Sequence, residues 1–156
     1  MEQSAKTDKR CKITTALLAL ITLFAGGMIY LLFRPTSLSM FEWIKHAGIL
    51  DTIEMLRLGI CTVPAWIEYT LPDGLWMFSY CLIIGCIWDF NLKKCGMSLI
   101  LLLFFAVLFE VLQYVHFLPG TFDRMDIIAY IIAFSLGTIY IIITNKFIKT
   151  KKIINL

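Results

Sequence analysis

Four long apolar segments alternate with polar stretches along the chain. A run of about 17–25 predominantly apolar residues is long enough to cross the hydrocarbon core of a bilayer as an α-helix. The segments are residues 13–33, 75–90, 97–117 and 127–144. The second is short, but Trp76 and Trp88 stand near its ends, where tryptophan commonly anchors a helix at the membrane interface. The pattern predicts an all-α, polytopic membrane protein with four transmembrane helices.

The connection between the first two spans, residues 34–74, is too long and too patterned for a simple loop. Ser39 and Glu42 have the spacing of a helix capping box, and Asp51 and Glu54 repeat it. We expect two short helices, residues 40–47 and 52–59, divided near Gly48. Their apolar faces would comprise Phe41, Trp43, Ile44, Ile53 and Leu56. Segment 38–70 is therefore predicted to be an amphipathic, outward-facing interfacial element, either a lid over a cavity or a surface anchor.

Further local signals concern helix ends and helix contacts. Pro64 suits the first turn of another short helix. Pro72-Asp73-Gly74 is a turn signal, and Asp73 is placed to cap the second transmembrane helix. In the fourth span the small residues Ala129, Ala133 and Gly137 recur every four positions, which lets a second helix approach closely. We expect that second helix to belong to the same bundle.

Composition agrees with the membrane class. Apolar residues make up 60% of the chain and charged residues 16%, against about 45–50% and about 25% in soluble domains. The length suits one membrane domain, residues 1–156. The first apolar segment is longer than the ~7–15-residue core of a signal peptide, and no small-residue cleavage site follows it. We therefore expect it to be retained as a helix.

The distribution of charge predicts the orientation. Most of the 14 lysine and arginine residues precede the first span, join the second to the third, or follow the fourth. Because such residues favour the cytoplasmic side, both termini should be cytoplasmic in a protein of the plasma (inner) membrane. Most acidic residues then lie on the outward side. Topology and anionic lipid explain the lysines, so no nucleic-acid partner is predicted.

Polar side chains gather between the third and fourth spans. Glu110 lies about 20 Å along the third helix at 1.5 Å per residue, and thus roughly 10 Å beneath the outer edge of a ~30 Å core. A charged side chain near the bilayer centre costs about 2.5–3.5 kcal/mol. Glu110 must therefore face the bundle or water, or stay protonated. Gln113 and Tyr114 share its helix face.

The turn at Pro119-Gly120 ends the third helix. Asp123 is placed to cap the fourth helix, and Asp126 falls in its first turn, where the helix dipole favours a carboxylate. Arg124 could neutralise one of these acids. The sequence thus predicts one outward-facing vestibule. Its candidate ligand-binding residues are Glu110, Gln113, Tyr114, Asp123, Arg124 and Asp126.

No cofactor and no metal are predicted. The five cysteines show no CxxC or Cys/His spacing, which is what a cysteine-ligated metal or a disulfide framework would need. A metal held by His116, Asp123 and Asp126 would have no recognised ligand spacing. Neither Ser79 nor Ser135 lies in a G-x-S-x-G elbow, which disfavours a serine hydrolase.

The same residues resemble the VanZ-like family of glycopeptide (teicoplanin) resistance membrane proteins. The family has a glutamate, a glutamine three residues later, a turn, and an aspartate-rich segment that leads into the last helix. Here the pattern reads Glu110-Val-Leu-Gln113, then Gly120-Thr-Phe-Asp123-Arg-Met-Asp126, and the resemblance covers about residues 98–145. The family often has arginine where Gly120 stands and asparagine where Tyr130 stands. The resemblance implies a small bacterial cell-envelope protein with a link to antibiotic resistance, and it implies no particular reaction.

Three classes of function are compatible with these features. The first is binding or remodelling of an amphiphile, such as a membrane lipid, a lipid-linked precursor or a lipopeptide antibiotic. The second is a membrane-embedded enzyme with Glu110 as its acid or base, although no nucleophile is evident. The third is a non-catalytic immunity or accessory subunit that binds another membrane protein. We rank binding first because the predicted vestibule lies within reach of lipid head groups.

Overall fold

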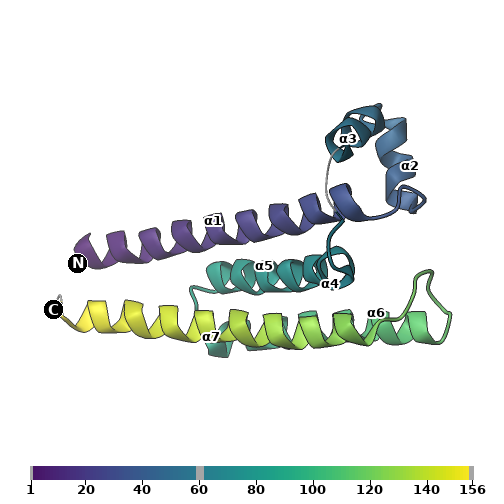
Figure 1. Ribbon diagram of the computed structural model, residues 1–156. Helices are drawn as coiled ribbons and strands as arrows, with labels where there is room; N and C mark the ends of the chain where they lie inside the picture. The colour runs from purple at the N-terminus through teal and green to yellow at the C-terminus, as the bar shows by residue number, and fades with distance from the viewer. Residues whose placement is uncertain (1, 59–61, 155–156) are drawn as a thin grey trace.

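The computed structural model describes residues 2–58 and 62–154, and this part of the chain is helical, with no strand. The helices are α1 (Glu2–Phe33), α2 (Ser39–His46), α3 (Leu50–Arg57), α4 (Ala65–Tyr69), α5 (Leu71–Ile87), α6 (Leu92–Tyr114) and α7 (Arg124–Ile154). Figure 1 shows the axes of the long helices α1, α5, α6 and α7 aligned with one another. The short helices α2 and α3 lie beyond the C-terminal end of α1 (Figure 1).

Three helical segments are long and apolar enough to cross a membrane. They are Asp8–Phe33, Leu92–Tyr114 and Arg124–Ile153. They contain the first and fourth segments predicted from the sequence and most of the third, and they support the assignment to the membrane class. Helix α5, which contains most of the second segment, has 17 residues, and at 1.5 Å per residue it is roughly 25 Å long.

The ends of α5 and α6 differ from the prediction. We expected α5 over 75–90 and α6 over 97–117, but each stops about three residues earlier. In both cases a residue after the helix adopts a left-handed φ, +53° at Asp89 and +57° at His116. The next residue then donates its N–H across the last turn, from Phe90 to the Gly85 oxygen at 2.7 Å and from Phe117 to the Leu112 oxygen at 2.9 Å. This Schellman-type closure ends each helix.

The predicted turn at Pro72-Asp73-Gly74 was wrong, because these residues form the first turn of α5. Proline is tolerated there, since the first N–H groups of a helix have no intrahelical partner. The N-cap of α5 is Thr70. The prediction that Asp73 caps this helix was therefore wrong. Its side chain is left for another role.

The predicted pair of short helices is present with shifted ends. Gly48, with a φ of +72°, separates α2 from α3. The N-caps are Leu38 and Ile49, not the Ser39 and Asp51 of the two capping-box patterns. The helix expected over 52–59 ends at Arg57, and residues 59–61 lie outside the described part of the chain. The short helix expected after Pro64 is confirmed as α4.

Side chains of α3 attach the α2–α3 pair to α1. Phe41 and Ile53 are buried, whereas Trp43 and Leu56 of the predicted apolar faces are exposed. The Arg57 guanidinium donates from Nε to the Leu31 oxygen at 2.8 Å and from Nη2 to the Arg34 oxygen at 2.7 Å. These oxygens belong to the end of α1, where backbone carbonyls lack helical partners and favour a cation.

Helix α5 packs between α1 and α7. Ser79 donates to the Ala19 oxygen of α1 at 2.7 Å, and Trp76 donates to the Leu23 oxygen at 3.2 Å. Trp76 therefore bonds within the bundle, and its role as an interfacial anchor stays a prediction. Such interhelical hydrogen bonds to buried polar groups are typical of membrane bundles.

Small residues allow α5 and α7 to approach closely. A Cβ built on Gly137 would stand 2.5 Å from the Cβ of Cys81, and one built on Gly74 would stand 3.5 Å from the Cβ of Ala129. The small-residue stripe of α7 therefore packs inside the bundle, which confirms that prediction.

Ion pairs distinguish the two ends of the bundle. Lys12 of α1 pairs with Asp89 of the α5–α6 connection, and Lys152 of α7 pairs with Asp8 at 2.9 Å. Both termini lie at this end (Figure 1). At the opposite end Arg34, after α1, stands 4.0 Å from Asp73 in the first turn of α5. Helices α1 and α5 are thus antiparallel.

Candidate carboxylate site

Glu110 is buried near the end of α6 that is opposite to the chain termini. Its side chain is 5% exposed. Its Oε2 accepts the backbone N–H of Asp123 at 3.4 Å. Glu110 lies one turn before the end of α6, where the dipole of its own helix disfavours a carboxylate. The contact brings it instead to the start of α7, where backbone N–H groups are free to donate.

Asp123 and Asp126 begin α7 as the sequence predicted. Asp123 precedes the first helical residue, and its Oδ1 accepts the N–H of Met125 at 2.8 Å. This is an N-cap hydrogen bond. Asp126 lies in the first turn and is 8% exposed. Its Oδ1 has no hydrogen-bond partner, and its carboxylate faces Thr70.

Asp73 of α5 joins these acids. It is close enough to Asp126 and Glu110 to interact electrostatically with both, and its carboxylate faces the Tyr130 side chain. Tyr130 in turn lies within electrostatic reach of all three acids. We name Asp73, Glu110 and Asp126 the carboxylate cluster. It draws one acid from each of α5, α6 and α7.

Sequence reasoning missed Asp73 and Tyr130. Asp73 was assigned to capping, and Tyr130 was noted only as a departure from a family pattern. One signal was available for Tyr130: it stands four residues after Asp126, on the same face of α7. For Asp73 no local signal separates a capping role from a role in the bundle.

Arg34 is a cation that lies beside the carboxylate cluster. Its guanidinium carbon lies 5.2 Å from the ring centroid of Tyr30 and 4.7 Å from that of Tyr69. Its Nη2 donates to the backbone carbonyl oxygen of Tyr69 at 3.0 Å and stands 4.0 Å from the Asp73 carboxylate. Stacking on two aromatic rings together with a planar donor group is a property of arginine that lysine does not share. Arg34 was also not among the predicted site residues.

Besides Asp123, which caps α7, three predicted site residues are not part of the cluster. Tyr114 is 65% exposed and packs edge-on against Phe122, with ring centroids 5.2 Å apart. Arg124 is exposed and forms no ion pair within the described residues, so it does not neutralise an acid as we expected. The Gln113 side chain lies against Gly120, where a Cβ would be 2.7 Å from Nε2.

The three acids of the carboxylate cluster lie beside one arginine, Arg34, that already bonds to a backbone oxygen and stacks on two rings. It offers buried carboxylate oxygens, a tyrosine hydroxyl and a threonine hydroxyl at the end of an apolar bundle. No group of three or more histidine, cysteine or acidic side chains with a metal-site arrangement occurs among residues 2–58 and 62–154. The chemistry that these groups perform best is hydrogen bonding and charge pairing with a donor or a cation.

Comparisons of the chain with models of known protein families, with curated proteins and with solved structures find no match.

Proposed function

We propose that the chain is a VanZ-like integral protein of the plasma membrane that binds or remodels an amphiphile at the carboxylate cluster. The amphiphile would be a lipid, a lipid-linked precursor or a lipopeptide. One observation carries the proposal: Asp126 is almost fully buried within an apolar bundle and keeps a carboxylate oxygen without a partner. An unpaired buried polar group is costly, and a ligand that supplies a donor would satisfy it.

A fourth membrane span and cytoplasmic termini are part of the proposal. The ion pairs of Lys12 with Asp89 and of Arg34 with Asp73 support an antiparallel arrangement of α1 and α5. If α1 crosses the membrane, α5 returns through it, although its 17 residues are near the lower limit for a span. The lysine-rich end then faces the cytoplasm by the positive-inside rule. The cluster faces outward, near the head groups of the outer leaflet.

The pair α2–α3 fits an interfacial anchor better than a lid. It exposes large apolar side chains, among them Trp43, Met55 and Leu58. It packs on α1, and Figure 1 shows it away from the α6–α7 connection. Helices of this kind lie in the plane of the interface.

An enzyme that uses Glu110 as acid or base ranks below binding. The Oε2 of Glu110 already accepts a backbone N–H, and the hydroxyl groups that face the acids are those of Thr70 and Tyr130. An accessory subunit that binds a second membrane protein is the remaining alternative. The test below separates it from amphiphile binding.

Native mass spectrometry of the gently solubilised full chain tests the proposal. We expect wild-type protein to carry a discrete bound amphiphile that Glu110→Gln loses. The matched control is Glu54→Gln, which makes the same change at an exposed position of α3 and should retain the amphiphile. Wild-type protein without an amphiphile, or equal binding in all three proteins, would overturn the proposal. A protein partner that co-purifies with all three would favour the accessory-subunit alternative.

A further inference from the structure

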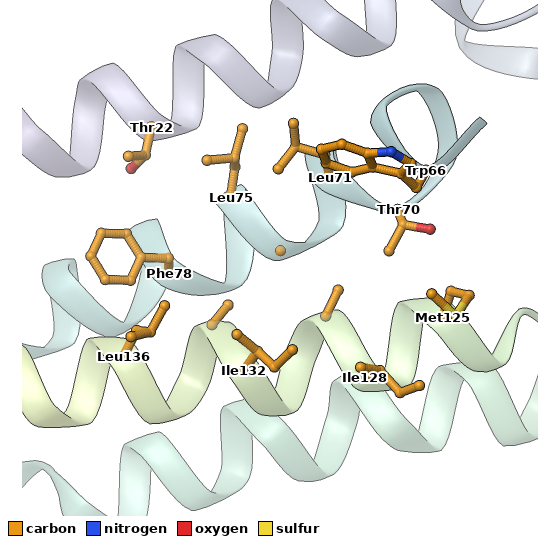
Figure 2. A pocket seen from close by; sticks show the side chains of 13 residues that line it. Thr22, Trp66, Thr70, Leu71, Leu75, Phe78, Met125, Ile128, Ile132 and Leu136 are labelled. Carbon is orange, nitrogen blue, oxygen red and sulfur yellow. The ribbon is translucent and has the colours of Figure 1, made fainter. Parts of the chain in front are cut away.

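A largely apolar groove runs along the bundle between α5 and α7 (Figure 2). Its volume is about 550 Å³, within the range of about 300–1,000 Å³ that is typical of small-molecule sites. It is lined by Thr22 of α1, Trp66 of α4, Thr70, four residues of α5 and six residues of α7. Figure 2 shows Leu75 and Phe78 on α5 and Ile132 and Leu136 on α7.

The groove offers almost no polar partner along its length. The Thr22 hydroxyl donates within its own helix, to the Leu18 and Ala19 oxygens at 3.0 Å each. The remaining lining of α5 and α7 is aliphatic or aromatic, apart from Gly74. From Met125 to Leu136 the α7 wall extends roughly 16 Å at 1.5 Å per residue. These dimensions suit one extended alkyl chain.

One end of the groove meets the carboxylate cluster. Thr70 and Met125 line that end (Figure 2). Thr70 faces the Asp126 carboxylate, and Met125 is the residue before Asp126 on α7. Asp126 itself does not line the groove, so an alkyl chain there would place its head group at Thr70 and Met125, next to Asp126.

The charge at this end is complementary to a cation. The cluster holds three acids, whereas the neighbouring Arg34 is held between two tyrosine rings and bonded to the Tyr69 oxygen. The helix dipoles of α5 and α7 favour Asp73 and Asp126 but not Glu110, which lies near the C-terminal end of α6. The unpartnered Oδ1 of Asp126 is an acceptor that an ammonium group would satisfy.

We infer that the groove and Asp126 form one site for a single-chain amphiphile with a protonated amine head group. The inference rests on the proposed function and adds the path of the chain and the charge of the head. The alkyl chain lies between α5 and α7, and the ammonium donates to Asp126. Because α5 and α7 run along the bundle, the ligand can enter sideways from the bilayer.

Binding of tetradecylammonium to the full chain in lipid nanodiscs tests this inference, with tetradecyl sulfate as the anionic probe of equal chain length. We expect wild-type protein to prefer the ammonium by about tenfold or more, because a close charge pair in a desolvated site is worth at least that much. Asp126→Asn should remove the preference. Equal binding of the two probes to wild-type protein would overturn the head-group assignment.

The path of the chain is tested separately. Ile132→Trp fills the groove, and Ile131→Trp is its matched control, since the two isoleucines are 55% and 51% exposed and Ile131 lies outside the groove lining. Ile132→Trp should weaken tetradecylammonium binding by about tenfold, and Ile131→Trp should not. Ile128→Trp is a second groove variant at an exposed position, and thermal unfolding checks that each variant is folded.

The outcomes separate the inference from the proposed function. Loss of binding in Asp126→Asn with full binding in both groove variants would keep the carboxylate site and overturn the groove. Unchanged binding in Asp126→Asn would count against the carboxylate cluster itself, and so against both.

Discussion

The contact between Gly137 of α7 and Cys81 of α5 should be sensitive to a single methyl group. A Cβ at position 137 would lie 2.5 Å from the Cβ and 3.2 Å from the Sγ of Cys81. Ordinary van der Waals contact begins at 3.4 Å. Gly137→Ala therefore requires the two helix backbones to separate by roughly 1 Å, and overpacking of this kind costs about 1–3 kcal/mol.

The chain supplies a matched control for this change. Gly27 lies in α1, and a Cβ there would meet nothing within 4 Å. Replacing glycine by alanine in a helix gains about 0.5–1 kcal/mol, and this gain is common to both variants. The difference in unfolding free energy between Gly27→Ala and Gly137→Ala should then be about 1–3 kcal/mol, with Gly137→Ala the less stable.

Reversible unfolding in mixed detergent micelles, followed by tryptophan fluorescence and circular dichroism, measures this difference. Adding Cys81→Gly to Gly137→Ala removes the colliding Cβ, so the double variant should show a favourable coupling energy of about 0.5–3 kcal/mol. Equal stability of Gly137→Ala and Gly27→Ala, or no coupling to Cys81, would refute the close approach of α5 and α7.

Two further changes test other local features. Gly120 has a φ of +136° and would place a Cβ 2.7 Å from the Gln113 Nε2, so Gly120→Ala should lower the unfolding free energy by about 1–3 kcal/mol. Gly48→Ala, at φ +72° in open space, should cost less, and the reverse order would contradict the contact with Gln113. The Lys12 ammonium holds the pKa of Asp89 below its ordinary value of 3.8, so this pair stabilises the fold above pH 3.8 and its contribution is lost as the pH falls through the lowered pKa. Because the Lys12 and Asp89 side chains are 44% and 66% exposed, Asp89→Asn should cost at most about 1 kcal/mol at pH 7 in denaturant titrations. A loss that persists in high salt or at low pH would show that another role was removed.

Several features of this protein follow from local sequence alone. The apolar runs predict the three long membrane-compatible helices, because twenty or so consecutive apolar residues have few alternatives to a transmembrane helix. The cap at Asp123 and the place of Asp126 in the first turn of α7 also follow from sequence, since both depend on neighbours within one turn. The ends of α5 and α6 could not be predicted as well from sequence, because the left-handed residues Asp89 and His116 close those helices without a glycine signal.

Only the tertiary structure brings the carboxylate cluster together. Asp73 and Arg34 lie far from Asp126 in the sequence, and their meeting depends on the register of α1 and α5 against α7. That register follows from contacts such as Gly137 with Cys81 and Ser79 with the Ala19 oxygen. Hydropathy locates a helix along the membrane normal but leaves its rotation undetermined. Both tyrosines lie one turn from a buried acid in the sequence. The rotation of each helix about its axis determines that Tyr130 faces the acids while Tyr114 packs against Phe122.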